Sequence, residues 1–192
     1  MKHIGLFFGS FNPIHIGHLA LANYMLSFTD LDEVWLVVSP HNPLKKKAGL
    51  LDQYDRLHLV NLALEYHTKI KSNNIEFSLS QPSFTINTLV HLREKFPKNK
   101  FSLIMGRDNL STFDKWKNFE EILKNHDLFI YPRKEGERSK FDKHKNVHLT
   151  EAPLMEISST FLRKAIKEKK NVQFFLHPKV WEYIDTNNLY RK

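Results

Sequence analysis

Short apolar segments alternate with longer amphipathic segments along most of this chain. Short, mostly apolar segments that predict strands occupy residues 4–8, 34–38, 101–105, 128–131 and 147–149, and the continuous apolar run at 34–38 is typical of a strand buried on both faces. Residues 75–79 alternate apolar and polar side chains, as a strand near the edge of a sheet does. Helical spacing of apolar residues or helix-start signals mark residues 16–28, 52–67, 83–96, 158–167 and 178–186, and shorter helical pieces are expected between 106 and 123.

The alternation of strands with helices predicts the fold. It indicates an α/β protein with a doubly wound parallel sheet of about six strands and with helices on both faces. Neither an internal repeat nor a linker interrupts the pattern, so we expect a single domain over residues 1–192. In such folds ligands bind beyond the carboxyl ends of the strands. The segments richest in polar chemistry follow predicted strands, at 9–18, 45–47, 106–108 and 133, and they are expected to converge on that edge.

The loop after the first predicted strand is the strongest candidate for a site. Gly9 allows the backbone to bend or to approach a ligand closely, and Asn12-Pro13 marks a turn. His15 and His18 lie where the following helix should begin. A helix N-terminus presents unpaired N–H groups and a partial positive charge, which suit phosphate, and two imidazoles add directional donors. Neither a carboxylate nor a cysteine lies close in sequence, so we do not expect this pair to bind a metal.

A second candidate lies about 140 residues further along the chain. Ser158 is a good N-cap, the hydroxyls of Ser159 and Thr160 follow at the start of a helix, and Arg163 lies about one turn further on. Taken alone, this string is more typical of an ordinary capped amphipathic helix than of a phosphate site.

Composition narrows the class of protein. Of the 192 residues, 41% are hydrophobic and 26% are charged, as in a folded globular protein, and no apolar run is long enough to predict a membrane span. The absence of cysteine excludes disulfides and thiolate chemistry. The first residues lack a signal-peptide pattern, so we expect a cytoplasmic protein without a membrane partner. The net charge of +8 fits an anionic partner, but the basic residues are scattered without a recognisable RNA-binding motif, so no nucleic-acid partner is expected.

The two candidate segments together resemble a known superfamily. The string G-S-F-N-P-I-H-I-G-H at 9–18 resembles the G-[ST]-F-[DN]-P-x-H-x-G-H signature of the nucleotidylyltransferases. I-S-S-T-x-x-R at 157–163 is similar to the C-terminal signature of the same superfamily. The resemblance implies a Rossmann-like nucleotidylyltransferase fold. It also implies an ATP-binding site made of Gly9, Ser10, Phe11, His15, His18, Ile157, Ser159, Thr160 and Arg163.

The middle of the chain resembles the bacterial nicotinate-nucleotide adenylyltransferases. S-F-T-I-N-T-L at 83–89 looks like their Y-T-x-[DN]-T-L segment, and the stretch 106–123 resembles their G-x-D-x-L…W-x-x-[WF]-x-x-I-L segment. The resemblance implies a nicotinate mononucleotide site made of Thr85, Asp108, Trp116 and Arg133. From the residues alone, Asp108 is equally well an N-cap of the following helix, and Trp116 is equally well a core residue.

The chain departs from the pattern of this family at four places, one of them the R-P-G pattern after the arginine, which Lys134-Glu135-Gly136 breaks. Phe84 replaces a tyrosine, which removes a hydroxyl, and Phe119 replaces a second tryptophan. The lysine loop, which usually contains P-P-H-K, is P-L-K-K at 43–46. It is therefore open which of the lysines at 45–47 contacts phosphate, and Lys46 is favoured.

The resemblance implies a reaction in which ATP and nicotinate mononucleotide give deamido-NAD and pyrophosphate, with Mg²⁺ bridging phosphate oxygens. His15, His18, Lys46 and Arg163 are then the expected catalytic residues, because they hydrogen-bond or neutralise the triphosphate. The alternatives are an adenylyltransferase acting on nicotinamide mononucleotide or phosphopantetheine, and a nucleotide-binding or RNA-binding module without catalysis. The sequence leaves open the oligomeric state, a homo-oligomer included, the preference for acid over amide, the order of substrate binding, and whether the loop 132–146 closes over ligand.

Overall fold

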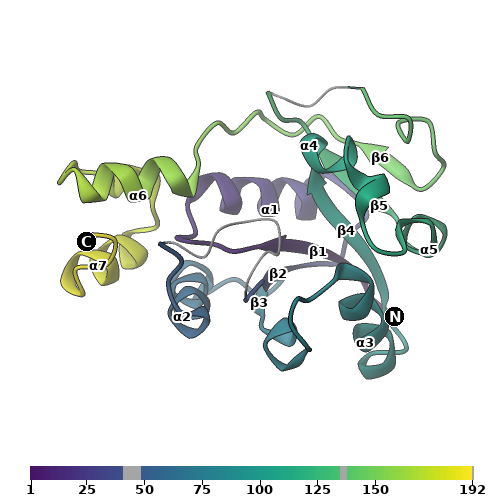
Figure 1. Ribbon diagram of the computed structural model, residues 1–192, viewed down its shortest axis with the longest axis horizontal. Helices are drawn as coiled ribbons and strands as arrows, with labels where there is room; N and C mark the ends of the chain where they lie inside the picture. The colour runs from purple at the N-terminus through teal and green to yellow at the C-terminus, as the bar shows by residue number, and fades with distance from the viewer. Residues whose placement is uncertain (41–48, 135–137, 192) are drawn as a thin grey trace.

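A parallel sheet lies at the centre of the fold (Figure 1). The computed structural model describes residues 1–40, 49–134 and 138–191. Within these ranges six strands are present: β1 (His3–Gly9), β2 (Glu33–Val38), β3 (Ile70–Asn73), β4 (Lys100–Gly106), β5 (Leu128–Tyr131) and β6 (Val147–Leu149). Their order is β3-β2-β1-β4-β5-β6, and every pairing is parallel. The prediction of a doubly wound parallel α/β sheet is therefore confirmed.

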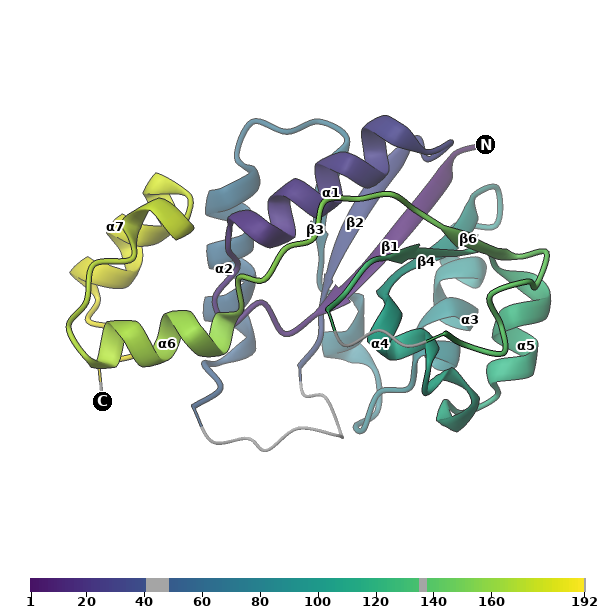
Figure 2. The same ribbon diagram turned by 90° about the horizontal axis from the view of Figure 1, so that it is seen from above.

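Helices cover both faces of this sheet (Figure 2). They are α1 (Ile16–Phe28), α2 (Gln53–Leu64), α3 (Thr85–Lys95), α4 (Arg107–Leu110), α5 (Phe119–Asn125), α6 (Ser159–Lys167) and α7 (Pro178–Thr186), with 3-10 turns η1 (Ile75–Ser78), η2 (Phe113–Lys115) and η3 (Gln173–Phe175). One hydrophobic core joins the sheet to α1, α2, α6 and α7, and a second joins it to α3, α4 and α5. No helix among the described residues is both long and apolar enough to cross a membrane.

Local signals in the sequence explain most of these elements. All residues of β2 are buried, as its unbroken apolar run predicted for a strand covered on both faces. Asp52 caps α2 by accepting a hydrogen bond from the Tyr54 amide at 2.8 Å, and Ser158 caps α6 by accepting from the Phe161 amide at 3.2 Å. Pro178 occupies the first position of α7, where its missing N–H costs nothing.

The strand predicted at 75–79 is wrong. The strand β3 lies five residues earlier, and Ile75–Ser78 forms a 3-10 turn. The reason is local, because the side-chain Oδ1 of Asn73 accepts a hydrogen bond from the Ile75 amide at 2.8 Å and closes a turn directly after the strand. Glu76 then points inward and is only 3% exposed, opposite to the outward position that the alternating pattern indicated.

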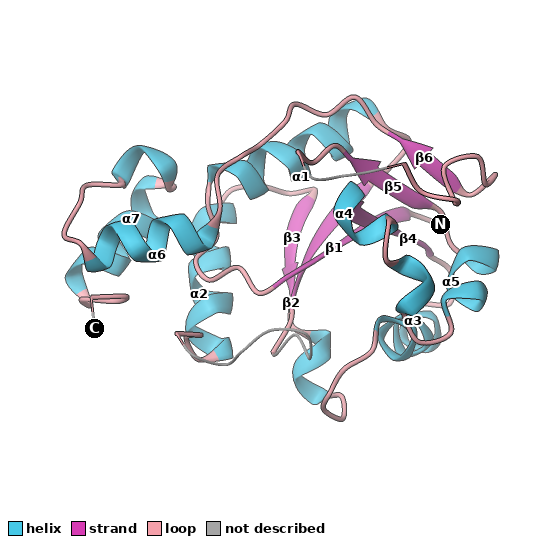
Figure 3. Cartoon of the chain, turned by 45° about the horizontal axis from the view of Figure 1, so that its top comes forward, coloured by secondary structure: helices cyan, strands magenta, loops and turns pink. Residues whose placement is uncertain are grey.

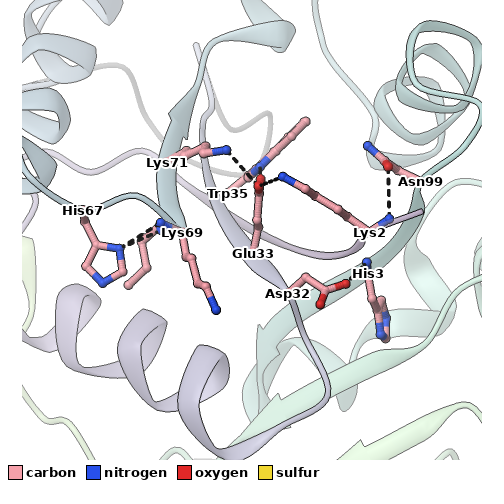
Figure 4. A network of polar contacts seen from close by, with 10 residues as sticks. Lys2, His3, Asp32, Glu33, Trp35, His67, Lys69, Lys71 and Asn99 are labelled. Carbon is pink, nitrogen blue, oxygen red and sulfur yellow. Dashed lines mark hydrogen bonds and ion pairs between the residues drawn. The ribbon is translucent and has the colours of Figure 1, made fainter.

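A buried carboxylate connects the amino ends of three strands through ion pairs and a hydrogen bond (Figure 4). Glu33 at the start of β2 pairs with Lys2 at 2.5 Å and with Lys71 of β3 at 2.8 Å, and it accepts a hydrogen bond from the Trp35 indole at 2.9 Å. Burial alone would raise the pKa of Glu33, but the hydrogen bonds from these three partners outweigh it and lower the pKa to about 2. The network therefore stabilises the folded chain only while Glu33 is ionised.

A buried arginine hydrogen-bonds the loops at the opposite edge of the sheet, where the carboxyl ends of the strands lie. Arg56 of α2 is 0% exposed, and its guanidinium donates to the carbonyl oxygens of Leu51 (2.9 Å), Ser10 (2.6 Å), Ser39 (2.7 Å) and Pro40 (2.8 Å). These carbonyls belong to the loop after β1, to the residues after β2 and to the segment that leads into α2. One side chain thus holds three loops at the edge where ligands bind in folds of this kind.

We predict that Glu33→Gln lowers the free energy of unfolding by roughly 2–3 kcal/mol at pH 7. Because the folded pKa of Glu33 is depressed to about 2, the wild-type advantage is complete above pH 4.5 and is lost as the pH falls toward 2. Urea unfolding of both proteins at several pH values measures this difference. A gap that stays constant down to pH 2 would show that packing, and not the charge of Glu33, stabilises the fold.

We predict that Arg56→Met destabilises the fold by roughly 3 kcal/mol, because it leaves several buried carbonyl oxygens without a donor. Arg56→Lys keeps the charge but has a compact ammonium that cannot reach carbonyls on three loops, so most of the loss should remain. Denaturant unfolding of the two variants and the wild type measures both effects. Full stability in Arg56→Lys would mean that the charge alone matters and that the forked geometry does not.

Candidate active site

The polar segments that follow the strands do lie at one edge of the sheet (Figure 3). Because all the strands run parallel, the loop after β1, the residues after β2, helix α4 after β4 and Arg133 after β5 share the carboxyl edge. The predicted convergence is confirmed for the parts of these segments that the structure describes. Lys46 lies outside the described residues.

Two stacked histidines open helix α1. His15 is the N-cap residue, and its ring lies 3.7 Å from the ring of His18 at an interplanar angle of 25°. The backbone N–H of His15 donates to Nδ1 of His18 at 3.3 Å. Since Nδ1 of His18 accepts this bond, a neutral His18 carries its proton on Nε2 and can donate from there. His15 is 4% exposed, and its pKa falls to about 4, first because of burial and second because of the Arg133 charge.

The glycine and the phenylalanine of the first loop have roles in packing. A Cβ at Gly9 would lie 2.8 Å from the ring of Phe11, so only glycine leaves room for that ring. Phe11 has a left-handed backbone (φ 43°), is 1% exposed, and packs edge-on against His18 with ring centroids 5.0 Å apart. Contact of ATP with Phe11 would therefore involve its backbone, whereas the neighbouring Ser10 is half-buried and has its carbonyl held by Arg56.

Helix α6 brings the second candidate segment onto the first. The Ser159 hydroxyl donates to the carbonyl of Pro13 at 2.9 Å, and Nη1 of Arg163 donates to the carbonyl of Asn12 at 2.8 Å. The other guanidinium nitrogen, Nη2, donates to the Thr160 hydroxyl at 3.3 Å. Ile157, just before the helix, is half-buried against the core. The hydroxyls and the arginine are thus placed beside the N-terminus of α1, although they are about 150 residues away in sequence.

The second part of the predicted site, which we call the acceptor side, comes from the middle of the chain and consists of the start of α3 and the segment around Trp116. Thr85 is the first residue of α3, and the N-cap residue, Phe84, makes no side-chain hydrogen bond to the helix. Trp116 is half-buried, with its ring 5.4 Å from that of Phe113 in the second core. The ammonium of Lys117 lies 4.7 Å from the centre of the Phe84 ring, so a cation–π contact connects the residue next to Trp116 with the start of α3. Trp116 therefore packs on the core on one side and keeps part of its surface exposed.

Arg133 lies between the histidines and the acceptor side. Its Nε is 3.9 Å from Oδ1 of Asp108, its guanidinium lies 5.4 Å from the centre of the Tyr131 ring, and its charge contributes to the low pKa of His15. Gly106 makes this approach possible, because a Cβ there would lie 3.1 Å from Cγ of Arg133. Asp108 is not an N-cap, since α4 begins at Arg107 with Gly106 as its cap residue.

Three residues of this edge were missed in the sequence. Asn12 is 3% exposed and hydrogen-bonds Gly49 and Leu51, and Arg56 holds the loops described above. The carboxyl of Glu76 hydrogen-bonds the hydroxyls of Thr88, Ser39 and Ser83, and burial raises its pKa. Arg56 had a detectable signal, a charged residue in the apolar stripe that also contains Val60. Glu76 had none, because it lies in the misassigned strand.

Metal binding finds little support in the side chains that the structure describes. No group of three or more histidine, cysteine, aspartate or glutamate residues within residues 1–40, 49–134 and 138–191 could hold an ion. An ion at this edge would need most of its ligands from a bound substrate and water.

Comparisons with known proteins identify relatives of this chain. Residues 6–165 match the family model described as cytidylyltransferase-like. A relative from Flavobacterium psychrophilum, named "Probable nicotinate-nucleotide adenylyltransferase", is 59% identical over 191 residues, which cover 98% of this chain and 99% of that protein. A relative of the same name from Christiangramia forsetii is 54% identical over 192 residues and 99% of both chains.

A solved structure shows the same fold. The nicotinic acid mononucleotide adenylyltransferase of Plasmodium falciparum, solved with NaAD, has a TM-score of 0.82 and 21% identity, and the match covers 99% of this chain and 98% of that one. The fold, the two joined motifs and the full-length relatives lead to one conclusion. This chain belongs to the nicotinate-nucleotide adenylyltransferase family of the cytidylyltransferase-like proteins.

Proposed function

We propose that this protein transfers the adenylyl group of ATP to nicotinate mononucleotide in NAD biosynthesis, giving deamido-NAD and pyrophosphate. The observation that carries the proposal is the contact between the two phosphate-binding motifs, in which Ser159 and Arg163 donate to the loop that leads into α1. The relatives that share most of this sequence have the corresponding name, and a structure of the same fold was solved with NaAD.

The reaction requires no general base from the protein. The attacking group is the phosphate of nicotinate mononucleotide, which is largely ionised near neutral pH because its second pKa is about 6. One of its oxygens forms a bond to the α-phosphorus of ATP, and the bond from that phosphorus to the bridging oxygen breaks, so that pyrophosphate leaves with the electron pair. The protein then has to align two polyanions and to stabilise negative charge.

The donor side of the site has the groups for this task. Before ATP binds, His15 is neutral at pH 7 because burial holds its pKa at about 4, so it meets the phosphates as a neutral hydrogen-bonding group. His18 donates from Nε2 to the ATP phosphates at the positive end of α1. Arg163 neutralises the triphosphate, Ser159 and Thr160 hold its far end, and Gly9, Ser10, Phe11 and Ile157 supply backbone contacts. Lys46 is proposed as a further cation, from outside the described residues.

The acceptor side of the site recognises the pyridine nucleotide. The carboxylate of nicotinate lies at the N-terminus of α3, where Thr85 and the backbone N–H groups of the first turn donate to it. Trp116 stacks on the pyridine ring with its exposed surface. Asp108 accepts hydrogen bonds from the ribose hydroxyls, and Arg133 neutralises the phosphate that attacks.

A divalent ion, Mg²⁺ in this proposal, accompanies ATP. The described side chains offer no group of three ligating residues, so the ion fits as a complex with phosphate oxygens and water, the coordination that Mg²⁺ prefers. Asp108, a carboxylate on α4 at the same edge of the sheet, is proposed for the outer shell of such a complex. The bound ion would neutralise charge on the triphosphate.

We predict that His18→Ala lowers kcat at least tenfold, and up to roughly 10²–10³-fold, because it removes a donor to charge that develops in the transition state. Its thermal unfolding temperature should stay near that of the wild type, since His18 is only half-buried. His91→Ala on α3 is the matched control and should keep full activity. Equal activity of His18→Ala and the wild type would exclude the proposed role of this histidine.

The proposed function itself is tested by pyrophosphate release from ATP and Mg²⁺ with three acceptors in parallel: nicotinate mononucleotide, nicotinamide mononucleotide and phosphopantetheine. We expect release with the nicotinate compound to exceed the other two at least tenfold. Release with another acceptor alone would keep the ATP site but overturn the assignments of Thr85 and Trp116. Measurable ATP binding without release for any acceptor would favour a module without catalysis.

A further inference from the structure

The hydroxyl of Tyr190 reaches from the C-terminal tail into the first motif. It lies 2.9 Å from Oδ1 of Asn12, across 178 residues of sequence. Burial raises the pKa of Tyr190, so the hydroxyl stays protonated at physiological pH and is the donor in this bond. The C-terminal tail therefore contributes one directed hydrogen bond to the loop that begins helix α1.

Two backbone groups fix the orientation of the Asn12 amide, and the Tyr190 bond adds to it. Oδ1 of Asn12 also accepts from the Leu51 amide at 3.3 Å, and Nδ2 donates to the carbonyl of Gly49 at 2.8 Å. A flipped amide would face the Leu51 N–H with its NH₂ group and the Gly49 carbonyl with its oxygen, so only one orientation satisfies both backbone groups. In that orientation Oδ1 faces the Tyr190 hydroxyl, which donates to it. Of the two donors to Oδ1, Tyr190 is the closer, and the Leu51 contact is long for a hydrogen bond.

Asn12 in turn joins three parts of the candidate site. It belongs to the loop between β1 and the stacked histidines, and its own carbonyl accepts from Arg163 of α6. Through Gly49 and Leu51 its side chain also holds the segment that leads into α2, beside the carbonyl of Leu51 that Arg56 binds. A rotation of this amide would therefore release the connection between the first motif and that segment.

The backbone of the tail after α7 directs Tyr190 toward Asn12. After α7 the residues Asn188 and Tyr190 have positive φ angles of 52° and 64°, which turn the chain back toward the body of the protein. Arg191 donates to Oδ1 of Asn188 at 2.9 Å and pairs with Asp185, which holds the turn against α7. Because α7 itself packs on α2 in the first core, the position of the tyrosine follows from the fold and not from a free chain end.

We propose that Tyr190 is a positioning residue for the ATP half of the reaction, acting through Asn12; this inference rests on the proposed adenylyl transfer. It predicts an effect on ATP and not on the acceptor, because Asn12 lies beside the first motif and Arg163, while Thr85 and Trp116 belong to other elements. A tyrosine with a merely structural role would change stability and would affect both substrates alike.

The first test compares Tyr190→Phe with the wild type in steady-state assays and in calorimetric titration with Mg²⁺–ATP alone. We expect kcat/KM for ATP to fall about fivefold to tenfold, the change that follows from the loss of one hydrogen bond at this position. KM for nicotinate mononucleotide should stay unchanged, and the unfolding temperature should fall by only a few degrees, as the loss of one buried hydrogen bond implies. Tyr183→Phe, on α7 with its ring packed against His58, is the matched control and should leave every value unchanged.

The second test asks whether Tyr190 acts through Asn12. In a double-mutant cycle of Tyr190→Phe with Asn12→Ala, the loss of the tyrosine hydroxyl should cost nothing further once the amide is absent. Additive losses would overturn the route through Asn12. If Tyr190→Phe keeps the ATP affinity and turnover of the wild type, the inference is wrong altogether. This outcome is informative even if Asn12→Ala does not fold.

Failure of the proposed function is distinguishable from failure of this inference. If the wild type binds ATP but transfers nothing to nicotinate mononucleotide, the proposed reaction is wrong. The calorimetric ATP affinity of Tyr190→Phe still tests the role of the tyrosine in that case, because the measurement involves no acceptor.

Discussion

The guanidinium of Arg56 is the constraint on which the carboxyl edge depends. Loops that leave a parallel sheet have carbonyl oxygens that no neighbouring strand can pair, and these need donors when they are buried. Arg56 donates to four of them, from the loop after β1, from the residues after β2 and from the segment before α2. A lysine ammonium is too compact to serve carbonyls in so many directions. The geometry of the first motif thus follows from a residue that contacts no substrate in the proposed mechanism.

The two edges of the sheet differ in how their cations are compensated. At the amino edge cations are neutralised by carboxylates, as Lys2 and Lys71 are by Glu33, and Lys100 is by Asp127. At the carboxyl edge the buried Arg56 and the more accessible Arg163 hydrogen-bond neutral carbonyls, so the charge of Arg163 remains available to an anion. Arg107 and Arg133 at this edge lie near carboxylates. The N-terminus of α1 adds a partial positive charge there, and a neutral His15 adds none. This distribution suits two polyanionic substrates at one edge only.

The sequence predicted the architecture well because its signals are local. Buried strands have continuous apolar runs, and Ser158 and Asp52 mark helix starts that the structure confirms. The strand at 75–79 failed because one hydrogen bond from Asn73 overrode an alternating pattern. For the site, the two motifs could be recognised from residue types, whereas their contact through Ser159 and Pro13 depends on packing between distant segments. Partners such as Asn12 and Tyr190 have no local signal at all, since 178 residues separate them.

The two halves of the proposed site are supported by separate sets of interactions. The ATP half rests on carbonyl contacts made by Arg56, Ser159 and Arg163, while the acceptor half rests on the Glu76 carboxyl behind α3 and on Lys117 against Phe84. Arg133 is the residue that connects them, because it approaches Asp108 on one side and acts electrostatically on His15 on the other. In the proposed mechanism, substitutions on the acceptor half would therefore change which nucleotide is accepted while the ATP half keeps its geometry. A change at Arg133 cannot be confined in this way, since its charge acts on both halves at once.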